Sequence, residues 1–493
     1  MAAGNLSGKG KPIAKGEWMN HSIAKNLSDF VNRVALFRFL VLPLVFALCS
    51  LVGATETILN LSDSKAKSPP GKAKLRVFVE TDAGGDPDDE QSMVRFLLYA
   101  KEWDIEGIIC TLSVARKGEN LNPERTGLGI VRRLIQAYGA CFPNLLLHDP
   151  DYPKPEWLLE RTVSGYEDSE EGVNRIVAAV DAPDPRPIWF MNWGTAGSAS
   201  SSLKRALDRV LKERGPSGYA AFKKRICLSS SDQFGEHTTR ILPPFPIWVD
   251  TFRPEMDKRR WYWRFSAITA KAGGFDIQRD MLTGHGPLGA LYPTNTTHKQ
   301  KEGDSMSFLY LVPTGMNDPR HPNWGSWAGR YGPNPAQKGL PYYWANQPDT
   351  WQGTTHRENS LIRFAVDLQN DFRARLEYCV KPFKGANHPP QVILNQIHGT
   401  EIVHLAVTPG QSQKMSAVGS KDPDGNALSY DWRVYAEAGS YPGKVTVQNA
   451  NNPEAEITLP KDLGSDSIHI LLTVKDSGIP SLTRYRRVVF TAK

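Results

Sequence analysis

Cysteine is scarce in this chain, and its few cysteines are widely spaced. Five occur among 493 residues, and no two of them form a CxxC pair. This spacing excludes a zinc ribbon and a dense disulfide framework. Cys110 and Cys227 lie in apolar runs, which is typical of plain buried residues. Beyond residue 54 an exported protein would still have room for one or two bridges among Cys110, Cys141, Cys227 and Cys379.

A strong charge of one sign is also lacking. Lysine and arginine exceed aspartate and glutamate by seven, and residues 1–38 account for four of these charges. The near-balanced remainder offers no basic surface for DNA or RNA. We therefore expect no nucleic-acid partner.

Long apolar runs are absent except near the amino terminus. Residues 39–54 carry no charge and contain a 14-residue apolar run, Phe39–Val52. A polar, basic extension over residues 1–38 precedes this run, and Gly53-Ala54 follows it. This order predicts a secretory signal peptide that is cleaved after about Ala54.

The alternative is an uncleaved anchor, but a bilayer needs about 20 apolar residues. The polar extension is long for a leader, so Met19 is an alternative start. We expect a secreted, periplasmic or cell-surface protein whose mature chain does not span a membrane.

The rest of the chain divides into a linker and two folded regions. Residues 55–74 are polar, contain Pro69-Pro70 and are typical of a linker. Residues 75–385 alternate short apolar runs with segments at helical spacing. This predicts an α/β domain with a mainly parallel sheet and helices on both faces. Residues 386–493 carry short strand-like runs between turn residues, which predicts an all-β sandwich.

Six carboxylates crowd one loop of the predicted α/β domain. Glu80–Glu90 (ETDAGGDPDDE) follows the strand predicted to begin at Leu75 and leads into a predicted helix. Ligands of such folds bind beyond the carboxyl ends of the strands. Clustered carboxylate oxygens suit calcium or magnesium. The alternative is a solvated acidic turn without a metal.

This loop and several later segments resemble a known family. Glu80-x-Asp82-x-Gly84 followed by Asp88-Asp89 is similar to the aspartate cluster of nucleoside hydrolases. Residues 80–98 resemble more closely the nucleoside-hydrolase-like, cellulose-binding proteins. The resemblance extends over residues 75–493 and includes the segments 226–233 (ICLSSSDQ), 284–293 (GHGPLGALYP), 302–331 and 368–379.

The resemblance implies a calcium site and a hydrolytic mechanism. Asp88 would be the general base that removes a proton from a metal-bound water. The resulting hydroxide would attack the anomeric carbon of a ribosyl-like ring. The implied calcium ligands are Asp82, Asp89, Asp318 and a backbone carbonyl near Gly197. Asp318 follows an apolar run, residues 308–312, that is predicted to be a strand. The implied substrate contacts are Glu80, Ser113, Asn192, Trp193 and Asp232.

The sequence also departs from the family pattern. The acidic loop is two residues longer than in nucleoside hydrolases, so Asp86 is an alternative metal ligand. Asn317 stands where a histidine often assists the departing base. His285 and His321 are alternatives for that role.

Aromatic residues crowd a Gly/Pro-rich segment and include Trp324 and Trp327. They form either a carbohydrate platform beside the site or a packing cluster that holds long loops. In the predicted sandwich, Asp422-Pro-Asp-Gly-Asn426 and Asp476 fit either a cadherin-like calcium site or a tight turn, and we favour the turn.

Two functions follow from these observations. The first is an exported calcium-dependent hydrolase of N-glycosidic or related glycosyl bonds, with a small-molecule glycoside as substrate. The second is a non-catalytic carbohydrate-binding protein on the same scaffold, with cellulose or another polysaccharide as partner. Nucleoside hydrolases often oligomerise, but the sequence identifies no interface.

Overall fold

The computed structural model describes residues 73–116, 126–195, 200–230, 265–294, 299–333 and 347–493, and the backbone of two short strands at 247–249 and 342–344. The predicted signal peptide and most of the predicted linker lie outside these residues, as do Gly197 and Asp232. No helix within the described ranges has both the length and the apolar character needed to cross a membrane.

An eight-stranded sheet forms the centre of the α/β region. Its order is β3-β2-β1-β4-β5-β6-β8-β7. All neighbouring pairs are parallel except β7 and β8, which confirms the predicted mainly parallel sheet. The strands are β1 (Leu75–Thr81), β2 (Trp103–Cys110), β3 (Thr162–Ser164), β4 (Ile188–Trp193), β5 (Ile226–Ser230), β6 (Ile247–Val249), β7 (Gly332–Pro333) and β8 (Tyr342–Trp344).

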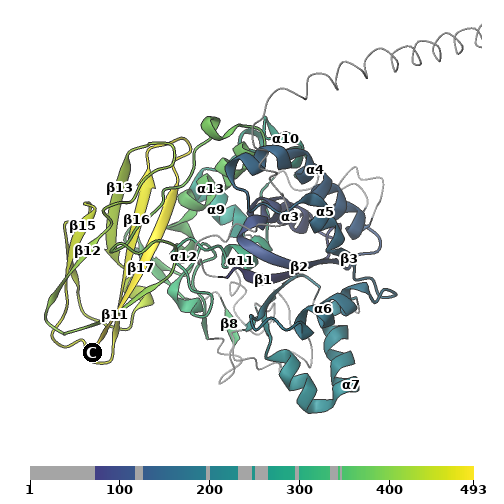
Figure 1. The fold of residues 1–493 in the computed structure, drawn as a ribbon, viewed down its shortest axis with the longest axis horizontal. Coiled ribbons are helices and arrows are strands. Elements are labelled where there is room, and N and C mark those ends of the chain that lie inside the picture. The colour runs from purple at the N-terminus through teal and green to yellow at the C-terminus, as the bar shows by residue number, and fades with distance from the viewer. Residues whose placement is uncertain are drawn as a thin grey trace, which may run out of the picture. The chain divides into compact units, whose positions relative to one another are not determined.

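Helices cover both faces of this sheet because its strands are apolar on both sides (Figure 1). In β1, Val77 and Val79 belong to one apolar core and Phe78 to the other. The first core also takes side chains from α3 (Pro87–Tyr99), α4 (Gly127–His148) and α5 (Pro155–Glu160). The second takes them from α6 (Glu171–Asp181) and α7 (Ser202–Lys223).

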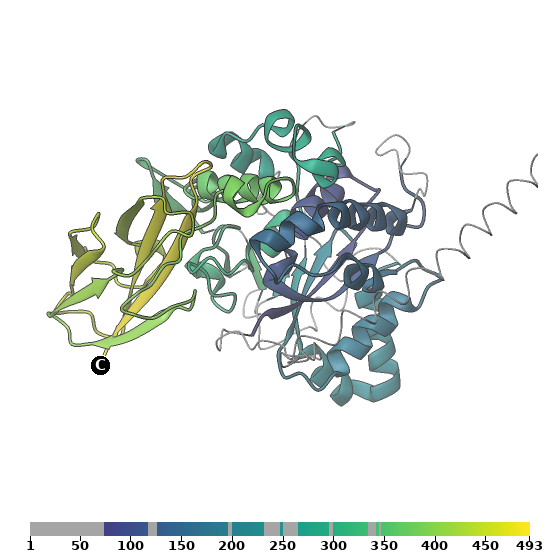
Figure 2. The same ribbon diagram turned by 45° about the horizontal axis from the view of Figure 1, so that its top comes forward.

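Further helices lie beside the sheet, some of them between it and the sandwich (Figure 2). One of them corrects the strand that the sequence predicts over residues 308–312. This apolar run instead begins in helix α11, and a short apolar run does not by itself distinguish a strand from a buried helix. These helices are α9 (Phe265–Gly273), α10 (Gly286–Ala290), α11 (Ser305–Leu309), α12 (Asn359–Ile362) and α13 (Ala365–Tyr378), and β9 (Asp349–Trp351) pairs with β10 (Thr354–His356).

Residues after 402 form the predicted sandwich. One sheet has the order β11-β17-β16-β13 and the other β12-β15-β14. Their facing side chains form a separate apolar core around Trp432, Ile470 and Phe490. The sequence did not predict β12 and β14, because one is polar and the other has three residues. The strands are β11 (Val403–Val407), β12 (Ser412–Ser416), β13 (Leu428–Val434), β14 (Thr446–Gln448), β15 (Glu454–Thr458), β16 (Ser467–Asp476) and β17 (Thr483–Ala492).

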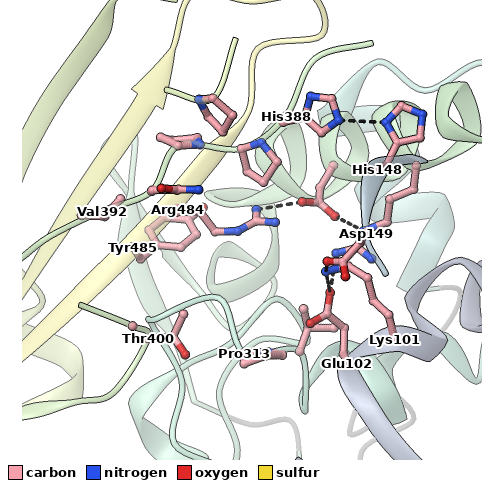
Figure 3. Close-up of a pocket in the computed structure, with 18 of the residues that line it drawn as sticks. Lys101, Glu102, His148, Asp149, Pro313, His388, Val392, Thr400, Arg484 and Tyr485 are labelled. Atoms are coloured by element: carbon pink, nitrogen blue, oxygen red, sulfur yellow. Dashed lines mark hydrogen bonds and ion pairs between the residues drawn. The ribbon is translucent and has the colours of Figure 1, made fainter. Parts of the chain in front are cut away.

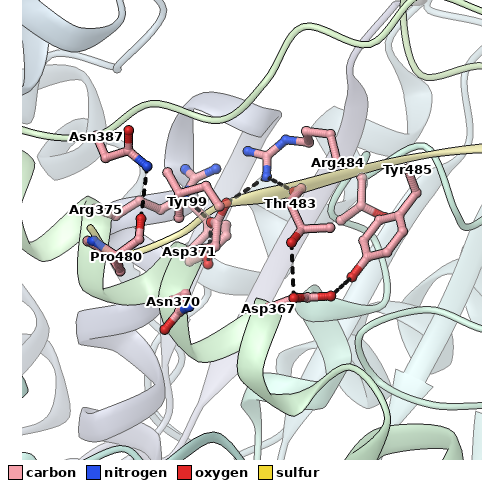
Figure 4. Close-up of polar contacts among 12 residues, drawn as sticks. Tyr99, Asp367, Asn370, Asp371, Arg375, Asn387, Pro480, Thr483, Arg484 and Tyr485 are labelled. Carbon is pink, nitrogen blue, oxygen red and sulfur yellow. Dashed lines mark hydrogen bonds and ion pairs between the residues drawn. The ribbon is translucent and has the colours of Figure 1, made fainter. Parts of the chain in front are cut away.

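The sandwich packs against the α/β region through β17, and residues 71–493 form one compact unit. Thr483 and Tyr485 of β17 both donate to the carboxylate of Asp367 on α13 (Figure 4). The backbone N–H of Tyr485 donates to the carbonyl of Thr314 at 3.1 Å. Arg487 Nε donates to the carbonyl of Met316 at 2.6 Å. Side chains of β17 therefore bind the α/β region, although the strand belongs to a sheet of the sandwich.

A buried ion network lies at the same junction. The carboxylate of Asp371 on α13 accepts from Tyr99 at 2.7 Å, from Arg375 at 2.7 Å and from Arg484 of β17 at 2.8 Å. Arg375 also donates to Glu102 at 2.7 Å. Burial alone would raise the pKa of Asp371, but the two arginines outweigh it and hold that pKa below its usual range. The network is therefore charged at neutral pH.

Candidate metal centre and active site

The acidic loop leaves the carboxyl end of β1 by a tight turn. The N–H of Gly85 donates to the carbonyl of Asp82 at 2.9 Å. Gly84 has φ +95°, and a Cβ there would lie 2.7 Å from Cβ of Ala115. Helix α3 then begins at Pro87, which places Asp88 and Asp89 in its first turn. A helix amino terminus favours negative charge, so the loop can hold these carboxylates close together.

Three carboxylates converge at this helix start. Asp88, Asp89 and Asp304 each offer an oxygen, and these oxygens lie within 4.8 Å of one another. Asp82 joins them because its side chain hydrogen-bonds to Asp89. Asp304 directly precedes α11, more than 200 residues along the chain from the loop. We name Asp82, Asp88, Asp89 and Asp304 the acidic cluster.

Burial and mutual repulsion make these carboxylates hard to ionise together. Burial raises the pKa of Asp88 to about 6, and the charge of Asp86 contributes to the same shift. Burial, with the charges of neighbouring members, raises the pKa of Asp89 and of Asp304 well above the usual range. Such a cluster is stable at neutral pH only if protons or a cation neutralise part of its charge.

The donor atoms of the cluster fit a hard divalent cation. One carboxylate oxygen of Asp304, Oδ2, is buried and has no hydrogen-bond partner. A buried polar atom without a partner costs free energy, and a cation would remove that cost. All the donors are carboxylate oxygens, which suit calcium or magnesium.

Two residues of β1 hold this arrangement in place. Thr81 Oγ1 donates to Asp89. Glu80 is fully buried and accepts from the backbone N–H of Ser202, the first residue of α7, and from Asn192 at 3.0 Å. Burial raises the pKa of Glu80 overall, while hydrogen bonds from Ser202, Thr195 and Ser201 lower it. The structure therefore gives Glu80 and Asn192 a positioning role behind the site, where the resemblance implied substrate contacts.

The structure does not bring Asp318 to the acidic cluster, which corrects its expected role as a ligand. Its carboxylate instead accepts from Arg320 Nη2 at 3.1 Å and lies 3.6 Å from His321 Nδ1. Burial alone would raise the pKa of Asp318, but Arg320 lowers it overall. Asn317 also makes local contacts, since its Nδ2 donates to the carbonyl of Tyr310 at 2.7 Å. Asp304 takes the place that the resemblance gave to Asp318.

Other residues expected at the site lie apart from the cluster or at its margin. His285 precedes α10, a helix that packs on α4. Asp86 is exposed and forms an ion pair with Lys301. Ser113 is exposed in the loop after β2. These contacts favour Asp86 as a solvent-facing residue beside the cluster.

The tryptophans have mainly packing roles. Trp193 is fully buried, and its Nε1 donates to Ser307 at 2.9 Å. Trp327 is 1% exposed and lies in the first apolar core. Trp324 is half-buried, stacks on His321 and meets His469 of the sandwich edge-on. Burial favours packing over a substrate contact for Trp193 and over a carbohydrate platform for Trp327.

The acidic loop of the sandwich forms the expected turn. Asp422 Oδ1 accepts from the N–H of Asp424 at 2.9 Å and from the N–H of Asn426 at 3.0 Å. The Asp424 carboxylate accepts from the N–H of His388, in the segment 386–402 that precedes β11. Asp476 accepts from Gly478 and Leu482. The contact between Asp424 and His388 braces the segment 386–402 against the sandwich.

A cavity lies where the α/β region meets the sandwich (Figure 3). This junction cavity has a volume of about 610 Å³ and is lined by both regions and by the segment 386–402 between them. His148, His388 and Phe383 stack on one another along one side. Glu102, Asp371, Arg375 and Arg484 contribute paired charges to its wall. Phe383 is 37% exposed and presents part of its ring to the cavity.

Comparison with known proteins agrees with this architecture. Residues 76–331 match the nucleoside hydrolase-like domain of cellulose-binding Sde182, and residues 413–492 match the C-terminal domain of cellulose-binding protein Sde0182. The fold is thus of the nucleoside hydrolase class with an added β-rich domain. The chain belongs to the Sde182 family of nucleoside hydrolase-like, cellulose-binding proteins.

One solved structure matches nearly the whole of this architecture. It is a nucleoside hydrolase-related protein from Saccharophagus degradans that is associated with carbohydrate metabolism. It is 30% identical, with a TM-score of 0.67, and the match covers 85% of this chain and all of that one.

Likenesses to solved β-domains are slight. A PKD domain of the KIAA 1837 protein is 23% identical over 19% of this chain and 80% of that one, with a TM-score of 0.14. Cadherin domains of protocadherin gamma B2 are 18% identical over 21% of this chain and 25% of that one, with a TM-score of 0.17. Scores this low carry no argument. None of the curated proteins matches the chain.

Proposed function

We propose that this chain is an exported, calcium-dependent hydrolase of N-glycosidic or related glycosyl bonds. The observation that carries the proposal is the convergence of Asp88, Asp89 and Asp304, with a buried and unpartnered oxygen on Asp304. Solvated acidic turns do not gather carboxylates from distant segments in a buried place. The apolar run at residues 39–54 supports export.

Each member of the cluster has a separate part in this proposal. Asp89 and Asp304 are the most buried, so they would hold the cation together with Asp82. When bound, calcium lowers the pKa of a water that it coordinates. Asp88 is partly exposed, so it is placed to accept a proton from the solvent side of the cluster. Thr81 holds the first turn of α3 through Asp89, and Glu80 holds the start of α7 through Ser202.

The test is calcium binding together with hydrolysis of nucleosides and aryl ribosides. Calorimetry should show a bound calcium ion, and chelation should stop hydrolysis. The absence of any divalent-metal binding would overturn the proposal. Calcium binding with no hydrolysis of any glycoside would leave the scaffold with a binding function only.

The stability of the metal-free protein should fall as the pH rises from about 4 to 7. A carboxyl group with a raised pKa binds its proton more tightly in the folded chain than in the unfolded one. Its contribution is therefore lost as the pH rises from the ordinary value of 3.8 to the folded value, which is about 6 for Asp88, and the pKa values of Asp89 and Asp304 are also raised well above 3.8. Thermal unfolding in a chelator, with and without added calcium, measures this.

Calcium should restore most of the lost stability at pH 7 and little at pH 4, where the carboxyl groups are protonated. The contribution of the cluster is isolated by subtracting the profile of Asp304→Asn. Parallel profiles for the two proteins would contradict the repulsion inferred here.

A second candidate function is the binding of a neutral polysaccharide without hydrolysis. The junction cavity favours it, because paired charges in its wall leave little net charge and Phe383 offers an aromatic ring. Aromatic rings stack on the apolar faces of sugars with modest free energies. This function is compatible with the first, because the cavity and the acidic cluster share no residue.

Phe383→Ala should weaken retention on insoluble cellulose by between about two- and ten-fold, since ring contacts contribute about 0.5–1.5 kcal/mol. A depletion assay with microcrystalline cellulose measures this. Val418→Ala is the matched control, because Val418 is an exposed apolar residue of the sandwich outside the cavity lining. Equal retention of the two variants would remove the cavity as the binding site.

A further inference from the structure

Two of the buried cysteines lie together, and their helices are far apart in the sequence. Cys141 is on α4, and Cys379 follows the last residue of α13. Asn144, one turn beyond Cys141, donates through Nδ2 to the carbonyl of Cys379 at 2.9 Å. This hydrogen bond fixes the backbone of Cys379 against α4.

Gly286, the first residue of α10, lies beside both cysteines. A Cβ built on Gly286 would lie 3.4 Å from Sγ of Cys141 and 3.7 Å from Cβ of Cys379. Gly286 has φ +76°, so glycine suits this position in both conformation and space. Both cysteines are at most 2% exposed. The two sulfurs therefore share one small buried place beneath α10.

The pair combines one thiol of lowered pKa with a second thiol beside it, which is the arrangement that forms a disulfide. The Cys379 thiol donates to the carbonyl of Arg375 at 3.8 Å. The interaction between the two cysteine side chains lowers the pKa of Cys141 to about 7 and raises that of Cys379. A thiolate is the form that attacks a disulfide. Cys110 and Cys227 differ, because burial in the sheet raises the pKa of each.

We propose that Cys141 and Cys379 form a disulfide that joins α4 to α13 in the exported protein. The Cys141 thiolate attacks one sulfur of a small disulfide, such as oxidised glutathione, and releases one thiol. The Cys379 thiolate then attacks the Cys141 sulfur and releases the second thiol. Two protein thiols are oxidised, and their two electrons and two protons reduce the small disulfide to two thiols. The proposal rests on the export proposed above for its oxidant alone.

The bond would brace the junction between the α/β region and the sandwich. Helix α13 carries Asp367 and Asp371, which bind β17. A disulfide at its carboxyl end would tie that helix to α4, which packs on the central sheet. It closes a long loop, so its stabilising effect is expected to be large for a single bond.

The test is to refold the reduced full chain in a glutathione redox buffer and map its thiols. After alkylation under denaturing conditions and digestion without reductant, peptides with Cys141 and Cys379 should be linked. Cys110 and Cys227 should be alkylated, and Cys49 is identified by its own peptide. Alkylation of all the cysteines, or linkage of any other pair, would overturn the proposal.

Thermal unfolding gives a second readout. The oxidised protein should unfold on the order of 5 °C above the reduced one, and dithiothreitol should abolish the difference. Cys141→Ser and Cys379→Ser should each remove this dependence on reductant, whereas the control Cys110→Ser should keep it. An equal effect of reductant on Cys141→Ser and on the unchanged protein would exclude this bond. Calcium titration of the same samples tests the metal proposal separately, because the pair does not include any member of the acidic cluster.

Discussion

Asp304→Asn is expected to weaken calcium binding strongly and to raise the stability of the metal-free protein. The substitution keeps the shape of the side chain but removes one buried charge from beside Asp88 and Asp89. Loss of a carboxylate ligand should weaken calcium binding by on the order of 100-fold. Loss of repulsion should raise the melting temperature in chelator by several degrees at pH 7.

The opposite signs of these two effects make the test sharp. A variant that merely folds badly would lose both calcium binding and stability. Asp318→Asn is the matched control, because it removes a buried aspartate that pairs with Arg320 outside the cluster. Isothermal titration and thermal unfolding of both variants are the measurements. Unchanged calcium affinity in Asp304→Asn would refute the assignment of this residue as a ligand.

Asp371→Ala is expected to lower the free energy of unfolding by about 3–5 kcal/mol, because it leaves Arg484 without this carboxylate and the buried Arg375 with Glu102 alone. Arg375 and Arg484 both donate to this carboxylate, and Arg375 is almost fully buried. The free energy of unfolding in urea measures the cost. The unfolding transitions of the α/β region and of the sandwich should both move to lower urea concentration, because Asp371 joins α13 to β17.

An exposed ion pair provides the control for this prediction. Asp181 and Arg214 lie 2.6 Å apart, with 44% and 35% of their side chains exposed. Asp181→Ala should change stability by less than about 1 kcal/mol. Comparable losses in the two variants would show that the junction network is not a special source of stability.

The sequence was sufficient to predict the sheet and the first half of the site. Strands such as β1 are apolar on both faces, and a carboxylate-rich loop at the end of such a strand has few structural uses. The local pattern therefore predicted a cation site in this loop, and the resemblance singled out Asp82, Asp88 and Asp89. The sandwich was predicted from the regular spacing of its strands and turns.

The sequence did not predict Asp304 as a member of the site, because the apolar residues 308–312 were predicted to be a strand. Residues 308–312 are apolar, and a strand there directs attention to Asp318 just beyond its end. The run instead begins in α11, so the converging carboxylate is Asp304 at the start of that helix. Glu302-Gly-Asp304-Ser305 was a usable signal, since it places acidic residues before a helix. The junction network could not be predicted, because only the tertiary fold brings α13 to β17.

The sharing of β17 between two regions has a consequence for how this protein would meet a polymer. Where a flexible linker joins a carbohydrate-binding domain to its partner domain, the length of the linker sets the range of distances between the two domains. Here the side chains of Arg484, Tyr485 and Arg487 bind the sandwich directly to the α/β region. A polysaccharide bound by one region would therefore have one fixed orientation relative to the other region. Grafting this sandwich onto another enzyme would leave those three side chains without their partners.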